Sequence, residues 1–202
     1  MRTVRSLLTV LMIASLGGAI SGCAGAVVGA GASAGVAASE ERGFGGALDD
    51  TKIRAEINRL WFDRDIEMYR KVTLNINEGR VMLTGMVATE QARADAVRLS
   101  WQASGVREVF NELQVRPDGE AGMDQANDVW IQNKLKARLL GDSDVKNINY
   151  TIDVTDAVVY LLGIAQNDTE MERVIAHARD VKGVKRVINH VRLKTDPRRN
   201  GT

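Results

Sequence analysis

The chain has 202 residues, with 27 Lys or Arg residues against 26 Asp or Glu residues and a formal net charge of +1. A charge so close to zero supports neither a nucleic-acid binder nor an acidic scaffold, and we expect no nucleic-acid partner. The single cysteine, Cys23, excludes an intramolecular disulfide.

Residues 1–22 have the pattern of an export signal. Arg2 and Arg5 form a positively charged start, and a short apolar stretch follows over residues 7–16. That stretch is shorter than the roughly 20 apolar residues that a membrane span needs. We therefore predict a signal peptide at this end of the chain.

The segment Ile20-Ser21-Gly22-Cys23 resembles the lipobox of bacterial lipoproteins. The resemblance implies cleavage before Cys23 and acylation of both its thiol and its new amino group. Ala24 follows in place of the aspartate that is associated with inner-membrane retention. The resemblance therefore implies a lipid anchor at the periplasmic face of the outer membrane. The alternative is an ordinary signal peptide with an incidental cysteine.

Residues 23–48 are built mainly from Gly, Ala, Ser and Val, which offer too little side chain to form a core. We predict that this segment is a tether. The stretches Gly25 to Gly29 and Gly31 to Gly35 each match GxxxG, so a close-packing helix at the bilayer is the alternative.

A first small domain is predicted over residues 49–117. It opens with a helix for which Asp50 is the expected acidic N-cap. An apolar stripe at helical spacing follows, made of Ile53, Ile57 and Leu60. Two alternating apolar runs then meet at a hairpin turn over residues 77–79, where Gly79 supplies a positive φ. A second helix capped by Thr89 and a closing strand complete the order helix, strand, strand, helix, strand.

The same plan recurs without a gap after a polar linker over residues 118–125. The pattern of Tyr150–Gly163 repeats that of Val72–Gly85, 78 positions earlier. Asp128 is the expected N-cap of the first helix, and Asn167 with Glu170 predicts a capping box for the second. A repeat of this length is a domain rather than a solenoid unit.

The second domain is predicted over residues 126–195, followed by a polar tail over residues 196–202. Residues 49–120 carry 11 basic and 13 acidic side chains, net −2, and residues 126–202 carry 13 and 10, net +3. The two copies have diverged in charge, and the second is better suited to an anionic partner.

Each copy resembles a BON domain, the αββαβ module of bacterial envelope and osmotic-stress proteins. The resemblance rests on VMLTG and VYLLG at the end of each hairpin, and on GVREVFNELQV and GVKRVINHVRL in the closing strands. It implies an α+β fold of two tandem BON domains, each with a three-stranded mixed sheet packed against two helices. A lipobox before two such modules resembles the phospholipid-binding dual-BON lipoproteins of the outer membrane.

The resemblance implies that the first helix of the second module contacts lipid. Trp130, Lys134 and Arg138 lie at i, i+4 and i+8 of that helix, beside the apolar stripe that begins at Ile131. An indole and two cations suit an anionic membrane surface, where each cation contributes about 1 kcal/mol. The alternative is that Trp130 packs onto the protein and that the cations form a solvated face.

The sequence offers no catalytic, metal or cofactor site. His177 and His190 have no nucleophile in a recognisable arrangement, and we expect ordinary surface or edge positions for both. Asp142 and Asp144 form only a weak calcium pattern. Asn111 and Asn189 lie in the two closing strands, where each is expected to satisfy a backbone group at a bend. We expect no catalytic role for either residue.

Two functions follow from these observations. The first is a non-enzymatic outer-membrane lipoprotein that binds anionic phospholipid through the second module and supports envelope integrity. The alternative is a periplasmic scaffold that binds proteins of an envelope assembly complex, with the anchor serving only for placement.

Overall fold

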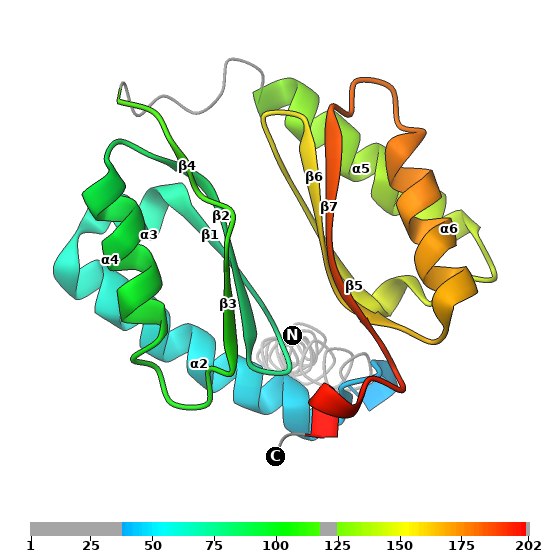
Figure 1. Ribbon diagram of the computed structural model, residues 1–202, viewed down its shortest axis with the longest axis horizontal. Helices are drawn as coiled ribbons and strands as arrows, with labels where there is room; N and C mark the ends of the chain where they lie inside the picture. Colours follow the sequence, from blue (N-terminus) through cyan, green and yellow to red (C-terminus); the bar gives the residue numbers. More distant parts are fainter. Residues whose placement is uncertain (1–37, 118–124, 201–202) are drawn as a thin grey trace, which may run out of the picture.

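The computed structural model describes residues 38–117 and 125–200. The predicted signal peptide, Cys23 and most of the predicted tether lie outside these ranges. The described chain forms two modules of similar plan (Figure 1). The elements of the first module are α2 (Gly43–Arg64), α3 (Ile66–Lys71), β1 (Val72–Asn77), β2 (Arg80–Val87), α4 (Glu90–Ser100), β3 (Glu108–Asn111) and β4 (Gln114–Val115).

The second module repeats this order. Its elements are α5 (Gln125–Gly141), η1 (Asn147–Asn149), β5 (Tyr150–Thr155), β6 (Val158–Ala165), α6 (Asp168–Arg179), β7 (Arg186–Leu193) and the terminal turn η2 (Pro197–Asn200). In each module the hairpin strands are antiparallel and the closing strand runs parallel to the second hairpin strand. In the first module this closing strand is split into β3 and β4, which both pair with β2. The predicted α+β fold with mixed sheets is confirmed.

Each hairpin turn is held by an aspartate from the first helix of its module. The Asp50 carboxylate accepts hydrogen bonds from both backbone N–H groups of Glu78–Gly79, at 2.9 and 2.8 Å. The Asp128 carboxylate accepts the two equivalent bonds from Asp156–Ala157, at 2.8 and 2.7 Å. All four turn residues have positive φ, which turns their N–H groups toward one acceptor.

The prediction that Asp50 and Asp128 are helix N-caps is therefore wrong. α2 begins at Gly43 and α5 at Gln125, so both aspartates lie within their helices and serve the turns instead. The early start of α2 also takes in residues 43–48, which composition assigned to the tether. Arg42 stabilises this start, since its guanidinium pairs with Asp50 at 2.7 Å.

The same helices also protect the outer edge of each sheet. Arg54 of α2 donates a hydrogen bond to the backbone oxygen of Leu74 in β1, at 2.5 Å. At the equivalent place in the second module, Gln132 of α5 donates to the backbone oxygen of Ile152 in β5, at 2.6 Å. β1 and β5 are edge strands, with no neighbouring strand on their outer side. These bonds therefore give two of their carbonyl groups a hydrogen-bond donor.

Other local predictions are confirmed. The Thr89 hydroxyl accepts from the N–H of Ala92 and caps α4, and the Asn167 side chain accepts from the N–H of Glu170 and caps α6. The Glu170 carboxylate does not complete the capping box at Asn167, because it accepts from the N–H groups of Lys146 and Gln166.

The two asparagines of the closing strands satisfy backbone groups, as predicted. The Asn111 side chain accepts from the N–H of Leu113, at 3.3 Å, where β3 gives way to β4. The Asn189 side chain accepts from the N–H of Val191, at 3.0 Å, within β7.

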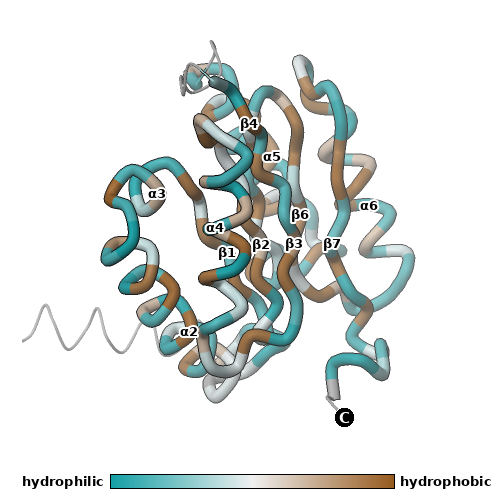
Figure 2. Tube along the Cα trace, turned by 60° about the vertical axis from the view of Figure 1, so that its left-hand side comes forward, coloured by the Kyte–Doolittle hydropathy of each residue, from teal (hydrophilic) through white to brown (hydrophobic). Residues whose placement is uncertain are grey.

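The two sheets face each other, with the helices on the outer sides (Figure 1). Viewed from another side and coloured by hydropathy, the strands of both sheets lie between the helices of the first module and α6 (Figure 2). Each module has its own apolar core between sheet and helices. A third cluster joins the sheets, and its members are Met82, Val158, Tyr160 and Leu162, with Phe110 and Ile188 packed against it.

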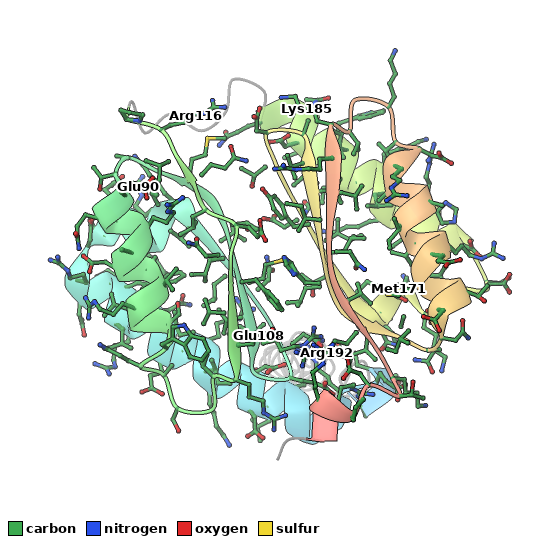
Figure 3. All side chains as sticks on the ribbon, viewed as in Figure 1. Glu90, Glu108, Arg116, Met171, Lys185 and Arg192 are labelled. Atoms are coloured by element: carbon green, nitrogen blue, oxygen red, sulfur yellow. The ribbon has the colours of Figure 1, made fainter. Side chains whose placement is uncertain are left out.

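Polar contacts surround this third cluster. Arg80 of β2 is 1% exposed and donates to the backbone oxygens of Gly163 and His190 in the second module, at 2.9 and 2.7 Å. Burial without a paired carboxylate lowers the pKa of Arg80 to about 10. Glu108 and Arg192, one from each module, form an ion pair at 2.6 Å (Figure 3). The two modules are therefore joined by specific contacts.

His190 lies in the edge strand β7, as predicted, but it belongs to this interface and is not an ordinary surface residue. Its ring stacks on Phe110 with the ring centroids 4.0 Å apart, and its Nε2 lies 2.8 Å from the Glu112 carboxylate. In β7, His190 points away from its own core and toward the other sheet. Strand alternation alone could not reveal that this face would be covered.

Candidate functional site

Helix α5 has two apolar faces. Its inner face carries Ile131, Leu135 and Leu139, which are buried in the core of the second module. Its outer face carries Val129, Trp130 and Leu140, which are 56%, 47% and 73% exposed. A helix that is amphipathic only toward its own core would carry polar residues on the outer side. The outer apolar face of α5 therefore is not explained by folding.

Val129 and Leu140 were missed by the sequence analysis. They lie about three helical turns apart and therefore on one side of the helix, opposite the buried stripe. Asn133 and Ala137, which are exposed, lie between them on the same side. Their spacing of 11 residues in the sequence already indicates that Val129 and Leu140 share one side of a helix.

Cations flank this outer face. Lys134 is exposed, and no ion pair or hydrogen bond of its ammonium group is found in the part of the chain that the structure describes. Lys136, also exposed, lies on the other flank. Asp128 is the acidic residue of α5, and its carboxylate is occupied by the two turn amides. The exposed charge of α5 is therefore positive.

Arg138 is less accessible to a membrane surface than predicted. Each step of four residues turns a helix by about 40°, so the row from Trp130 through Lys134 to Arg138 rotates toward the buried stripe. Arg138 is half-buried, and its guanidinium donates to the backbone oxygen of His177, at 3.3 Å. The structure thus leaves Trp130 and Lys134 open to solvent and holds Arg138 against α6.

The equivalent helix of the first module shares only part of this surface, because the exposed Phe62 stands at the position of Leu140. Lys52, at the position of Trp130, pairs with Asp49 at 3.0 Å. Glu56, at the position of Lys134, accepts a hydrogen bond from the N–H of Ser104. The two modules have the same fold but present different chemistry to solvent.

The remaining candidates have structural roles. The Asp142 carboxylate lies 2.7 Å from Nε2 of His177 and also pairs with Arg173, and these contacts hold its pKa below the usual range. Across residues 38–117 and 125–200, no group of three or more His, Cys, Asp or Glu side chains is placed to hold a metal ion. No helix within those ranges is long and apolar enough to cross a bilayer.

The structure thus defines a tandem α+β protein whose distinctive feature is an outward helix face of apolar side chains and cations. Residues 49–117 and 127–195 each match the BON domain. The chain belongs to the BON-domain family and contains two copies of the domain.

Three known proteins are similar to this chain along most of its length. The chain is 42% identical over 147 residues to a protein of Anaplasma centrale named for the gshII 5′ region, covering 73% of this chain and 96% of the relative. It is 30% identical over 171 residues to the outer membrane lipoprotein DolP of Haemophilus influenzae, and the match covers 84% of this chain and 87% of that relative. It is 28% identical over 151 residues to the osmotically-inducible protein Y of Escherichia coli, and the match covers 74% of this chain and 75% of that relative.

Proposed function

We propose that this protein is a non-enzymatic lipoprotein of the outer membrane, anchored by acylated Cys23, and that the outer face of α5 binds anionic phospholipid. The observation that carries the proposal is that exposed apolar residues of α5 lie beside Lys134, whose ammonium group has no ion pair among the described residues. Aromatic and aliphatic side chains settle at the level of lipid headgroups, and cations are attracted to anionic lipid.

The relatives support placement in the envelope. One is named as an outer membrane lipoprotein and another as an osmotically inducible protein. The match to BON domains, rather than to a catalytic family, supports a role in binding and in envelope integrity. Several acyl chains on Cys23 would anchor the chain stably, whereas a single chain binds only marginally.

The anchor and α5 would act together. Tethering raises the effective concentration of α5 at the bilayer, so a surface of modest intrinsic affinity remains bound. Such an arrangement lets α5 respond to the lipid composition below it while the anchor holds the protein in place.

The lipid role is tested with a chain that starts at residue 24, which lacks the thiol and keeps every described residue. We expect it to bind anionic vesicles better than neutral ones, and salt to weaken the binding. Trp130→Ala and Lys134→Glu should each weaken it, whereas Trp101→Ala, at an aromatic residue 52% exposed in the first module, should not. Unchanged binding by both α5 variants would reject this role and favour a protein-interaction scaffold.

The anchor is tested separately in the complete chain. Cys23→Ser should move the protein from the membrane fraction to the soluble fraction of cells, because no acyl chain can then be attached at that thiol. Retention of the variant at the level of the parent would reject Cys23 as the main anchor.

A further inference from the structure

The first module carries an exposed apolar surface of its own, made of Phe62 at the end of α2 and of Ile66 and Tyr69 in α3. These side chains are 59%, 45% and 45% exposed. The rings of Phe62 and Tyr69 meet edge to face, with their centroids 6.0 Å apart. We call these three residues the α3 surface. Single exposed apolar residues are ordinary, but a contiguous group indicates a contact site.

Folding of the first module does not require this surface. Met68 is the residue of α3 that enters the core, where it is 4% exposed. The Asp65 carboxylate caps α3 by accepting from the N–H of Glu67, at 2.9 Å. The short helix is thus fixed by its cap and by one buried side chain, and its other apolar residues remain on the outside.

The end of α3 lies close to the start of α5. A cleft of about 590 Å³ between the modules is lined by Arg70 and Lys71 on one side and by Val129 and Gln132 of α5 on the other. Arg70 and Lys71 directly follow Tyr69, and Val129 belongs to the outer face of α5. The α3 surface and the outer face of α5 therefore lie on either side of one cleft.

Two cations lie at the end of α3, where the cleft begins. Arg70 and Lys71 are exposed and share one carboxylate, that of Glu67, at 3.2 and 3.4 Å. With the exposed Asp65 at the start of α3, this segment carries two cations and two anions, and both cations lie at the end that lines the cleft. Exposed pairs of this kind contribute little, so they can be exchanged for contacts with lipid phosphates.

The two acidic residues that line the cleft are bonded within the protein. The Asp128 carboxylate already accepts the two turn amides. The Asp153 carboxylate is bonded to the Thr84 hydroxyl across the modules, and burial raises the pKa of Asp153. Both carboxylates are therefore committed to contacts within the protein.

We propose that the α3 surface is a second membrane contact, which enters the headgroup region of the same anionic bilayer that α5 binds. The proposal rests on the proposed function of α5 and extends it to the first module. Contact at two places, one on each module, fixes the orientation of the protein on the bilayer, whereas one helix would leave it free to rotate about α5.

The test uses the complete lipoprotein reconstituted into vesicles that contain a phosphatidylglycerol fraction. Ile66→Cys, Leu140→Cys and Trp101→Cys are each labelled with an environment-sensitive fluorophore, and quenching by spin-labelled lipid is measured. The parent without an added cysteine gives the background from Cys23. We expect strong quenching at positions 66 and 140 and little at position 101, at the other end of the first module.

The outcomes separate the two proposals. Quenching at position 140 with none at position 66 would overturn the α3 contact and leave the role of α5 intact. No quenching at either position would overturn both. Quenching at position 66 alone would support the α3 contact and contradict the proposed role of α5.

A second measurement does not depend on labels. In the chain that starts at residue 24, Arg70→Ala and Lys71→Ala should each weaken binding to anionic vesicles about fivefold, since a cation at the surface contributes about 1 kcal/mol. Lys52→Ala is the matched control, because Lys52 is exposed and pairs with Asp49 near the start of α2, away from Phe62. Losses no larger than that of the control would overturn the proposal.

Discussion

Replacing Leu140 by alanine should weaken membrane binding while leaving the fold intact. Leu140 is 73% exposed, so most of its side chain is available to enter a bilayer. Full burial of a leucine side chain contributes about 1.5 to 3 kcal/mol, and the exposed share of Leu140 therefore corresponds to about 1.5 kcal/mol. Alanine would lose most of this, which is roughly a tenfold loss of affinity.

The adjacent residue provides a matched control. Leu139 is 1% exposed in the core of the second module, and Leu139→Ala should lower the free energy of unfolding by about 2 to 5 kcal/mol. Leu140→Ala should change it by less than about 0.5 kcal/mol, as for other surface substitutions. Two neighbouring leucines are thus expected to affect different properties.

The assay is cosedimentation of the chain from residue 24 with anionic vesicles at several lipid concentrations, together with thermal unfolding of each variant. If Leu140→Ala binds like the parent and remains folded, the outer face of α5 does not contact the bilayer. If it loses both binding and stability, Leu140 has a structural role that its exposure does not show.

Three further predictions concern the structure itself. Asp50→Asn and Asp128→Asn should each lower the free energy of unfolding by about 2 kcal/mol, because the two turn N–H groups bond to separate carboxylate oxygens and an amide keeps only one of them. Chemical denaturation tests this, and no change would contradict it. Arg80→Ala should cost about 3 kcal/mol or more, with faster hydrogen exchange in β6 and β7, because two bonds between the modules are lost; unaltered exchange would refute it. Burial raises the pKa of Asp153, so the folded state holds this proton to higher pH than the unfolded state does. The free energy of unfolding therefore falls as pH rises from the ordinary carboxyl range through the raised pKa. Asp153→Asn should therefore gain stability relative to the parent across that window, in unfolding measured against pH, and a constant difference would contradict this.

The local structure was predictable because short-range signals determine it. The first hairpin is predicted by the alternation of apolar residues and by Gly79, and the structure confirms it. The starts of α4 and α6 are predicted by their caps, Thr89 and Asn167. The N-caps at Asp50 and Asp128 were wrong because the same residue type serves equally well as an acceptor for turn amides. Only the folded hairpin, which brings two N–H groups to each carboxylate, decides between these roles.

The interface between modules was not predictable in the same way. Arg80 and the backbone oxygen of His190 are separated by 110 positions in the chain, and no local pattern connects them. Each sheet also presents alternating residues on the face away from its core, as any strand does. Whether that face meets solvent, a partner or the second copy depends on the packing of the two modules.

Comparison of the two copies within this one chain separates residues that build the module from residues that give it a surface. Structural contacts recur at equivalent positions: an aspartate on the turn, a side chain on the edge strand and an asparagine in the closing strand. The outward pair Trp130 and Lys134 does not recur, since Lys52 and Glu56 stand at these positions in the first copy, whereas Leu140 corresponds to the exposed Phe62. A feature required by the fold should appear in both copies. The exposed pair Trp130 and Lys134 appears in one copy only, so its cause is to be sought in binding.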